Sequence, residues 1–389
     1  MSAFHVSRTG SGKAQYHPRM MLGLLVYCYA RGVFSSRRIE QATYRDVSVR
    51  FIAADSHPDH DTIAKFRREN GPAFQAAFAH ILLLAKELGL LRLGTVSIDG
   101  TKIDANASKI KSLRYDRIQT LRAKLESDIA QLMAKAEAAD REPGDDGLSL
   151  PEEIARRQGL KAKLDAAAER LEAAVRDGDD SDDPPPGSLP PPPERQTNLT
   201  DPDSSIMRKS VRHEYRQAYN AQAIVDADGS QLVLATHVLA TSNDRQDFDA
   251  FIDDLCRAHG KPQTLLADAG YAAEAIVEGL QQRNIEPLIA VARNSEPRPY
   301  DFRPPRKSDK PPPAITAAWR KDMVAKLQTD EARKQYRKRK CTVEPVFGII
   351  KSILGFTRFQ LRSIENVKLE WMLVALAYNC KRLSAITAR

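Results

Sequence analysis

One predicted β-strand, residues 93–105, lies far ahead of every other predicted strand, and this separation restricts the folds that the chain can adopt. Strands resume only with "YRQAYNAQAIVDADGSQLVLATHVLA", in which Asp228-Gly229 is a strong hairpin signal. A helix over residues 244–257, the short strand "TLLAD", another helix and the strand "PLIAVA" follow. This order predicts a mixed sheet, three antiparallel strands followed by parallel ones, that is interrupted by a long insertion.

The insertion has a helical pattern. Apolar residues recur at spacings of three and four in two stretches, which are Ile118, Leu121, Leu125, Ile129 and Leu132, then Leu160, Leu164, Leu171 and Val175. They predict a coiled helical hairpin over residues 111–176. Residues 177–198 hold an acidic run and "PPPGSLPPPP", and predict a disordered or extended linker because proline joins neither a helix nor a central strand. Residues 93–110 and 199–389 then form one α/β domain, in the strand order of a ribonuclease-H-like fold.

Residues 1–92 have a helical pattern and predict a small all-helical domain. Asp59 or Asp61 can cap the segment "TIAKFRREN", and Gly71-Pro72 begins a last helix. Basic residues stand on the polar side of this domain, among them Arg37, Arg38 and Arg67. That side is either a solvated basic face or a surface that contacts DNA.

The charge balance favours an anionic partner. Lys and Arg number 59 against 51 Asp and Glu, a formal net charge of +8, so nucleic acid is the first candidate. The cysteines are far apart and lack metal-binding spacing, which predicts four free thiols and a reduced compartment. The apolar run "MMLGLLVYCYA" is too short to span a bilayer, and no signal peptide precedes it. We therefore expect a cytoplasmic protein without a membrane partner.

The segment "VSIDGTKIDANAS" places two carboxylates in the first strand. Asp99 and Asp104 are an odd number of residues apart, so they point to opposite faces of a regular strand. Asp99 lies in the middle of the strand, whereas Asp104 lies near its end. We predict that Asp99 belongs to a functional site.

A second candidate, Asp268, ends "TLLAD" directly before Ala269-Gly270-Tyr271. Functional groups gather at the carboxyl ends of strands in open α/β sheets, and a glycine there lets the chain turn away. Alternatively, Asp268 only caps the helix that follows. If Asp99 and Asp268 lie on neighbouring strands, they can share a divalent cation, since hard oxygen ligands suit Mg²⁺ or Mn²⁺.

The third candidate is Glu344 in "YRKRKCTVEPVFGIIK". Pro345 predicts that a helix begins near Glu344, which places Lys351 on the same helix face two turns later. Taken alone, the pair is better explained as a carboxylate at a helix N-terminus and a solvated lysine. However, six of the eight residues 333–340 are Lys or Arg, and such density repels itself unless phosphates lie beside it.

These segments resemble a known family. "VSIDGTKIDANAS", "YNAQAIVD", "LLADAGY" and "YRKRKCTVEPVFGIIK" are similar to the catalytic blocks of bacterial insertion-sequence DDE transposases with a Tyr-Arg-Glu-Lys signature. "YHPRMMLGLLVYCYARGVFSSRRIEQA" and "PDHDTIAKFR" resemble the N-terminal domain of the same proteins. The resemblance runs in unbroken order from Tyr16 to Leu383.

The resemblance implies a site. Asp99, Asp268 and Glu344 would be a catalytic triad that binds two Mg²⁺ or Mn²⁺ ions. Tyr336, Arg339 and Lys351 match the signature, whose residues contact DNA near the cleavage site. Four residues separate Arg339 from Glu344 where the commonest signature has three, so Lys340 is an alternative for the arginine's place. The expected DNA-binding residues are Tyr336, Arg337, Arg339, Lys340, Lys351, Arg37, Arg38 and Arg67.

The resemblance also implies an activity, the metal-dependent cleavage and strand transfer of DNA at insertion-sequence ends. The partners would be double-stranded DNA, as terminal inverted repeats and as target, and a second copy of the chain assembled on that DNA. An alternative is an N-terminally truncated remnant that binds DNA without cutting, because the segment before "YHP" is shorter than the family's usual lead. For the hairpin, pairing of two DNA ends and a passive surface insertion both stay open.

Overall fold

The computed structural model describes residues 4, 15–139, 150–177, 191–208, 214–291 and 315–388. The chain forms two compact units. The first comprises Met1–Ile103, Asn220–Leu361 and Glu365–Arg389, and the second comprises Asp104–Tyr219 and Arg362–Ile364. The predicted N-terminal helices therefore share a unit with most of the predicted α/β domain.

Among the described residues, a mixed sheet of six strands organises the α/β part. The sequence predicted a mixed sheet but not the short strand at residues 205–207. The strands are β1 (Thr95–Asp104), β4 (Ser205–Met207), β5 (Arg216–Asp226), β6 (Val233–Leu239), β7 (Thr264–Ala267) and β8 (Glu286–Ile289). Their order is β4-β5-β1-β7-β8, and β6 also pairs with β5. Strand β5 is antiparallel to β4 and β6, whereas β7 is parallel to β1 and β8. The β5–β6 connection contains Asp228-Gly229, which confirms the predicted hairpin.

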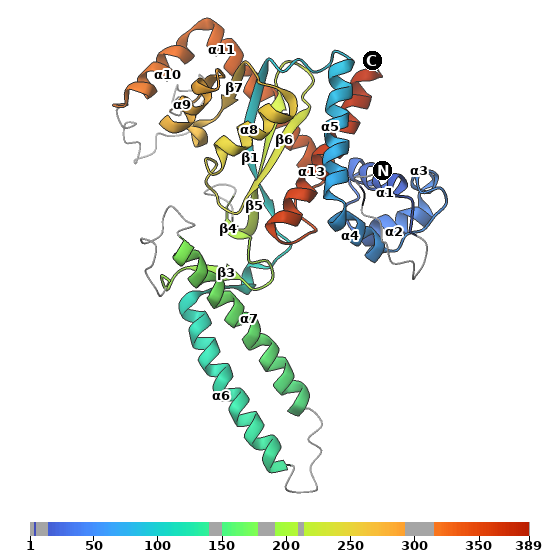
Figure 1. The fold of residues 1–389 in the computed structure, drawn as a ribbon, viewed down its shortest axis with the longest axis vertical. Coiled ribbons are helices and arrows are strands. Elements are labelled where there is room, and N and C mark those ends of the chain that lie inside the picture. The colour runs from blue at the N-terminus through green and yellow to red at the C-terminus, as the bar shows by residue number, and fades with distance from the viewer. Residues whose placement is uncertain are drawn as a thin grey trace, which may run out of the picture. The chain divides into compact units, whose positions relative to one another are not determined.

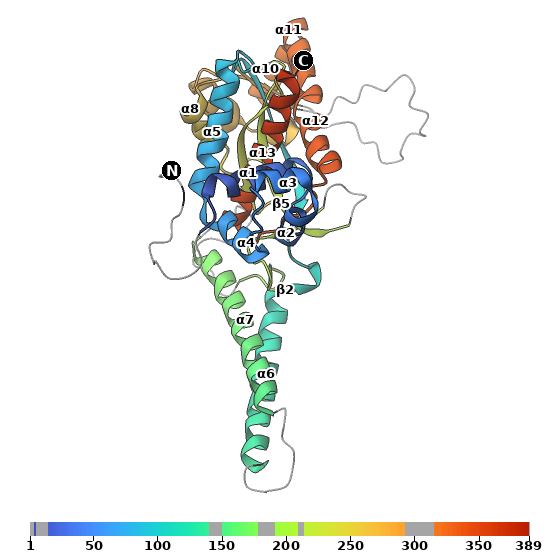
Figure 2. The same ribbon diagram turned by 90° about the vertical axis from the view of Figure 1, so that its right-hand side faces the viewer.

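Helices cover the sheet. Every residue of β7, and of β5 after Arg216, is buried, as expected for strands with helices over both faces. Helix α13 is attached to the sheet by side chains: Trp371 Nε1 donates to the carbonyl of Gln222, and the Asn379 amide bonds to both backbone groups of Val233. Helices beside the sheet (Figures 1 and 2) include α8 (Phe248–His259), α9 (Glu274–Gln282), α10 (Ala318–Gln328), α11 (Asp330–Arg337), α12 (Val343–Gly348) and α13 (Ile364–Thr387).

Five helices form the described N-terminal part, residues 15–92, where the sequence predicts an all-helical region. Asp59 accepts a hydrogen bond from Thr62 N at 2.6 Å and caps the fourth helix, and the fifth begins at Gly71 as predicted. The four shorter helices gather beside α5 and one part of α13 in both views (Figures 1 and 2). The five are α1 (Pro18–Ala30), α2 (Ser36–Arg45), α3 (Val47–Ile52), α4 (His60–Glu69) and α5 (Gly71–Glu87).

A buried polar network joins these helices to α13. Glu370 is fully buried and accepts hydrogen bonds from Tyr29 Oη and from the backbone N–H groups of Gln360 and Leu361. Arg67 Nη1 lies 3.6 Å from Glu370 Oε1 and donates to Tyr29 Oη. Arg67 is only 3 % exposed. The prediction that Arg67 lies on a DNA-binding surface is therefore wrong, because its guanidinium compensates a buried carboxylate inside the protein.

Gly32 lets the chain leave α1 in contact with the C-terminal part. Its φ is +79°, and a Cβ there would lie 2.6 Å from the carbonyl oxygen of Leu354. We expect Gly32→Ala to lower the free energy of unfolding by about 2–3 kcal/mol, from left-handed strain and a backbone clash together. Chemical denaturation of the two proteins measures the difference.

Gly89→Ala is the control for that prediction. Gly89 also has a positive φ, of +68°, but no atom lies within 4 Å of the position of its Cβ. This variant introduces the backbone strain alone, so its free energy of unfolding should fall by only about 1 kcal/mol. Equal losses in the two variants would show that the approach to Leu354 is unimportant.

The second compact unit contains the helical hairpin. Helices α6 (Tyr115–Ala139) and α7 (Leu150–Asp177) lie side by side along their length (Figure 2), as the apolar spacing predicts. Ion pairs cross between them, for example Arg122–Asp165 at 2.6 Å and Arg157–Asp128 at 2.9 Å. At its base, β2 (Ser112–Arg114) pairs with β3 (Gln196–Asn198). The buried apolar core of the two helices, α6 and α7, consists of Tyr115, Ile118, Leu125, Leu164, Ala167, Ala168 and Leu171.

Strand β3 corrects one prediction. Residues 196–198 were expected in the linker, but they form a strand because the three residues of β2 offer them backbone hydrogen-bond partners. Most of the predicted linker, residues 178–190, lies outside the described residues. All four cysteines are free thiols, as predicted. Within the part of the chain that the structure describes, no helix is long and apolar enough to cross a membrane.

Candidate active site

Two neighbouring parallel strands carry the first two candidate carboxylates. Asp99 lies in the middle of β1, and Asp268 directly follows the last residue of β7. The register pairs Ser97 with Leu266, which brings the two aspartates to the same part of the sheet. Asp104 has a different partner, since its carboxylate accepts a hydrogen bond from Arg216 Nη1 at 3.1 Å.

Asp268 caps a turn and also lies close to Arg339. Its Oδ1 accepts a hydrogen bond from Gly270 N at 2.8 Å and caps the short 3₁₀ turn Ala269–Tyr271. Its Oδ2 lies 3.7 Å from Arg339 Nη2. Capping uses one oxygen and leaves the other oxygen for the site.

Arg339 connects all three candidate carboxylates. It lies in the 3₁₀ turn Lys338–Cys341, between α11 and α12, and Glu344 lies in the first turn of α12. Its Nη2 donates to Asp99 Oδ2 at 2.8 Å, and its Nη1 donates to Glu344 Oε1 at 3.1 Å. With Asp268 at 3.7 Å, three carboxylates from three separate elements converge on one guanidinium group.

The electrostatics of Asp99 reflect this crowding. Burial raises the pKa of the Asp99 carboxyl to about 6, because a charge is poorly solvated there. Arg339 opposes that rise, whereas the negative charges of Asp268 and Asp244 add to it. A further cation beside Asp99 would lower this pKa, because a nearby positive charge favours the ionised carboxylate.

Tyr336 and Lys351, which were expected to belong to a signature with Arg339, attach helices of the C-terminal part to the same strands. Tyr336 Oη donates to the carbonyl of Ala267, next to Asp268, at 3.2 Å. Lys351 Nζ donates to Thr101 Oγ1 and to the carbonyl of Lys102 on β1. Lys351 lies in a π-helical turn, Ile349–Ile353, rather than in the regular helix that the sequence predicts. Such single π-turns occur frequently at functional sites.

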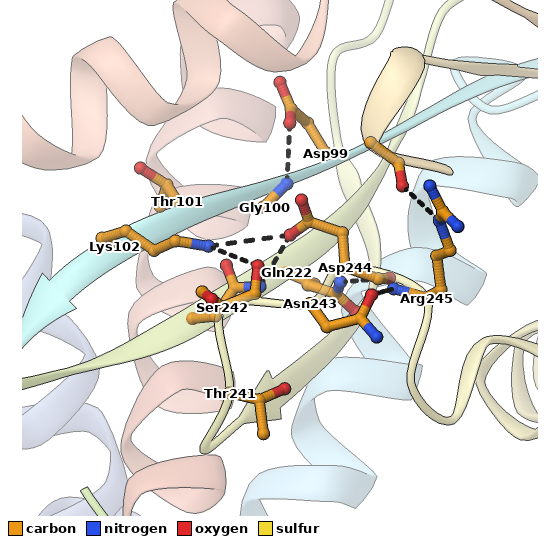
Figure 3. A network of polar contacts seen from close by, with 12 residues as sticks. Asp99, Gly100, Thr101, Lys102, Gln222, Thr241, Ser242, Asn243, Asp244 and Arg245 are labelled. Carbon is orange, nitrogen blue, oxygen red and sulfur yellow. Dashed lines mark hydrogen bonds and ion pairs between the residues drawn. The ribbon is translucent and has the colours of Figure 1, made fainter. Parts of the chain in front are cut away.

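Asp244 is a fourth carboxylate at the site, and the sequence did not reveal it (Figure 3). Its Oδ1 accepts a hydrogen bond from Asn220 Nδ2 at 2.6 Å and lies 3.8 Å from Lys102 Nζ. Residues 244–247 were expected to begin a helix. However, Asp247 has a φ of +56°, so α8 begins only at Phe248 and Asp244 stays in a loop. No motif marks this aspartate.

Two glycines leave room for Asp244. A Cβ on Gly100 would lie 2.8 Å from Asp244 Oδ1 and 2.7 Å from Asn220 Oδ1. A Cβ on Gly270 would lie 2.9 Å from both Asp244 Oδ2 and Asp268 Oδ1. Any larger residue would displace these oxygens, which explains why glycine follows the first aspartate and stands near the second.

The remaining predicted DNA-binding residues are dispersed. Arg37 and Arg38 are exposed on α2, and Arg337 and Lys340 are exposed near the site. Arg337 also lines a hollow of about 470 Å³ on the first compact unit. The other basic residues around this hollow are Lys334, Lys338 and Arg382.

The donor set fits a hard divalent cation. Three carboxylates supply the oxygen ligands that Mg²⁺ and Mn²⁺ prefer, and their combined charge requires a positive partner. Among the described residues, no three His, Cys, Asp or Glu side chains are already placed to hold a metal ion. Arg339 now lies between Asp99, Asp268 and Glu344. The carboxylates would hold a cation once that guanidinium has left.

Sequence comparisons identify two matching regions. Residues 194–380 match the family model described as a transposase DDE domain, and residues 2–69 match the model described as a transposase domain (DUF772). The first region contains Asp268 and Glu344, whereas Asp99 precedes it. No curated protein and no solved structure matches the chain.

Proposed function

We propose that this chain cuts DNA strands at the ends of its own insertion sequence and joins them to target DNA. The premise is that the chain is a transposase with a DDE domain, and thus a polynucleotidyl transferase. One observation carries the proposal: Asp99, Asp268 and Glu344 converge on a single guanidinium group. A further support is the sheet, whose order of antiparallel and then parallel strands is consistent with a ribonuclease-H-like domain.

In the proposed mechanism, Asp99, Asp268 and Glu344 would hold the divalent cations. When bound, two such ions activate the attacking oxygen and stabilise the leaving oxygen of an in-line phosphoryl displacement. Tyr336 and Lys351 fix the C-terminal helices on the strands that bear the aspartates. Exposed basic residues, including Arg337 and Lys340, would bind the DNA phosphates beside the scissile bond.

The test is a cleavage assay on a labelled duplex that carries the terminal repeat flanking this gene. With Mg²⁺ or Mn²⁺ we expect nicking at the repeat boundary and, with added target DNA, products joined through a 3′ end. With EDTA we expect neither. DNA binding without cleavage under all these conditions would contradict the proposal and favour a protein that occupies element ends without cutting them.

The raised pKa of Asp99 predicts how metal binding depends on pH. Below its pKa of about 6 the carboxyl is mostly protonated, so a cation must displace a proton. Apparent Mn²⁺ affinity should therefore fall as pH drops through 6 and level off above it. Calorimetric titration with Mn²⁺ from about pH 5 to pH 8 measures this change in affinity. Asp99→Asn should bind Mn²⁺ more weakly than the wild type and should not show the change near pH 6.

We also propose that two copies of the chain act together on DNA, because strand transfer needs two ends held at one place. The hairpin α6–α7 is a candidate for pairing, with exposed Met133 and Leu160 on its surface. Light scattering of the protein with and without terminal-repeat DNA would detect the dimer. A monomer bound to each isolated end, with no paired complex, would argue for a passive surface insertion.

A further inference from the structure

We propose that Arg339 is an exchangeable counter-cation of the triad. Its guanidinium would hold Asp99, Asp268 and Glu344 while no divalent cation is bound, and would move to a DNA phosphate when a cation replaces it. This inference rests on the proposed function, because it assigns a loading step to the same site. It adds a second role, gathering the carboxylates, to a residue expected only to contact DNA.

The contacts show that one side chain serves three acids. Arg339 Nη2 lies 2.8 Å from Asp99 and 3.7 Å from Asp268, and Nη1 lies 3.1 Å from Glu344. Charge-assisted hydrogen bonds of this kind are stronger than neutral ones. Without this cation, the three carboxylates would repel one another, and Asp99 is the least solvated of them. Arg339 therefore keeps the ligands close together before any metal ion arrives.

A third nitrogen of Arg339 is unused. Its Nε is buried and has no hydrogen-bond partner in the structure. A buried donor without an acceptor is costly, so the present contacts do not satisfy this guanidinium fully. A phosphodiester takes two parallel hydrogen bonds from the edge of a guanidinium. The unused Nε–H is thus a reason to expect a second partner of that chemistry.

The surrounding backbone permits the change of partner. Arg339 lies in a four-residue 3₁₀ turn, and Thr342, which follows it, has φ −116° and ψ −84°. Short 3₁₀ segments are frequent connectors between helices, so the Arg339 side chain is not fixed within a regular α-helix. The side chains of Glu344 and Asp268 are 51 % and 41 % exposed, against 18 % for Asp99. A cation can therefore approach the first two from solvent and displace Arg339 from that side.

Other basic side chains near the site have different positions. Lys102 lies beside Asp244, and Lys351 donates to β1. Lys340, which sequence spacing offers as the alternative signature residue, is exposed. Among the described residues, Arg339 is the one with ion pairs to all three acids of the triad.

The first experiment measures Mn²⁺ binding by calorimetry without DNA, for the wild type, Arg339→Gln and Arg333→Gln. Because the competing guanidinium is removed, Arg339→Gln should bind Mn²⁺ about tenfold more tightly than the wild type. Arg333 is exposed on α11, so its variant should bind Mn²⁺ as the wild type does. Equal or weaker affinity for Arg339→Gln would overturn the exchange.

Thermal melting provides a reading that does not depend on affinity. In EDTA, Arg339→Gln should melt below the wild type because the carboxylates lose their counter-cation, and saturating Mn²⁺ should remove most of this difference. Recovery in Mn²⁺ also shows that the variant is folded. Arg339→Lys keeps the positive charge but loses the planar guanidinium that donates to two acids at once, so we expect an intermediate melting temperature in EDTA. A variant that melts like the wild type in EDTA contradicts the holding role.

The second experiment tests the move to DNA. Binding of terminal-repeat duplex is measured at several salt concentrations in EDTA and in Ca²⁺, which supplies a divalent charge with little expected cleavage. Arg339→Gln should match the wild type in EDTA, where the guanidinium is held by the acids. In Ca²⁺, the slope of log K for DNA binding against log[salt] should be shallower for Arg339→Gln than for the wild type by about 0.9, the contribution of one phosphate. The same loss in both conditions would mean that Arg339 contacts DNA permanently.

These outcomes separate the inference from the proposed function. If the wild type and the double variant Asp268→Asn/Glu344→Gln bind Mn²⁺ equally, the triad is not the metal site and the proposed function fails. If the double variant loses Mn²⁺ binding but Arg339→Gln behaves as the wild type in all three experiments, only the exchange is refuted.

Discussion

Replacing Asp99 or Asp268 by Asn, or Glu344 by Gln, is expected to reduce DNA strand cleavage by at least about a thousandfold while duplex binding survives. Cations at such sites stabilise the transition state by several kcal/mol, and each 1.36 kcal/mol is tenfold in rate. The amides keep the shape of the carboxylates but cannot neutralise a divalent cation. Single-turnover cleavage of a labelled terminal-repeat duplex, together with an equilibrium binding assay, measures both quantities.

The three variants should differ in stability. Asp99 is 18 % exposed and its pKa is raised, so Asp99→Asn removes a poorly solvated charge and should not lower the melting temperature. Asp104→Asn is the control, because it lies on the same strand but pairs with Arg216 instead of Arg339. Full cleavage by any triad variant, or loss of cleavage by the control, would refute the assignment of the site.

Glu370→Gln is expected to lower the free energy of unfolding by about 3–5 kcal/mol, the loss typical when one partner of a buried ion pair is removed. Glu370 is fully buried, and its two oxygens accept three hydrogen bonds beside Arg67. The substitution leaves Arg67 as an uncompensated buried charge. It also places an amide NH₂ where an acceptor is needed. Denaturant unfolding followed by circular dichroism measures the loss.

Two further variants make this result specific. Glu365→Gln changes an exposed acid on the same helix, paired with Lys368, and should cost less than about 1 kcal/mol. The double variant Arg67→Met/Glu370→Gln should be more stable than the sum of its single changes predicts, because it removes both charges of the pair. Additive losses would show that Arg67 and Glu370 do not stabilise each other.

The sequence predicted those features that depend on local pattern. Alternation and position in the strand distinguished Asp99 from Asp104, and Pro345 located the start of α12 within one residue of Glu344. Heptad-like spacing predicted both hairpin helices. The element order predicted the mixed sheet, because strand signals and helix signals alternate plainly from residue 216 onward. In each case the signal that predicts the element lies within a short stretch of the sequence.

The features that were missed depend on distant partners. Arg67 looked like a surface residue because Glu370, which compensates it, lies on the last helix. The run of six basic residues could not show which one points inward, since the 3₁₀ turn that directs Arg339 to the acids has no sequence signal. Asp244 was assigned to a helix, and only the left-handed conformation of Asp247 releases it into the site.

The network around Glu370 has a consequence for the synthesis of this protein. Tyr29 and Glu370 are 341 positions apart in the sequence. At a translation rate of roughly 5–20 residues per second, Tyr29 is added to the growing chain about 17 to 70 s before Glu370. The earliest helices to be made are thus the last to complete their packing. A polypeptide terminated before Glu370 would lack the carboxylate that accepts from Tyr29 and compensates Arg67. Its N-terminal helices would be incompletely packed, and we expect such a fragment to be a substrate for proteolysis.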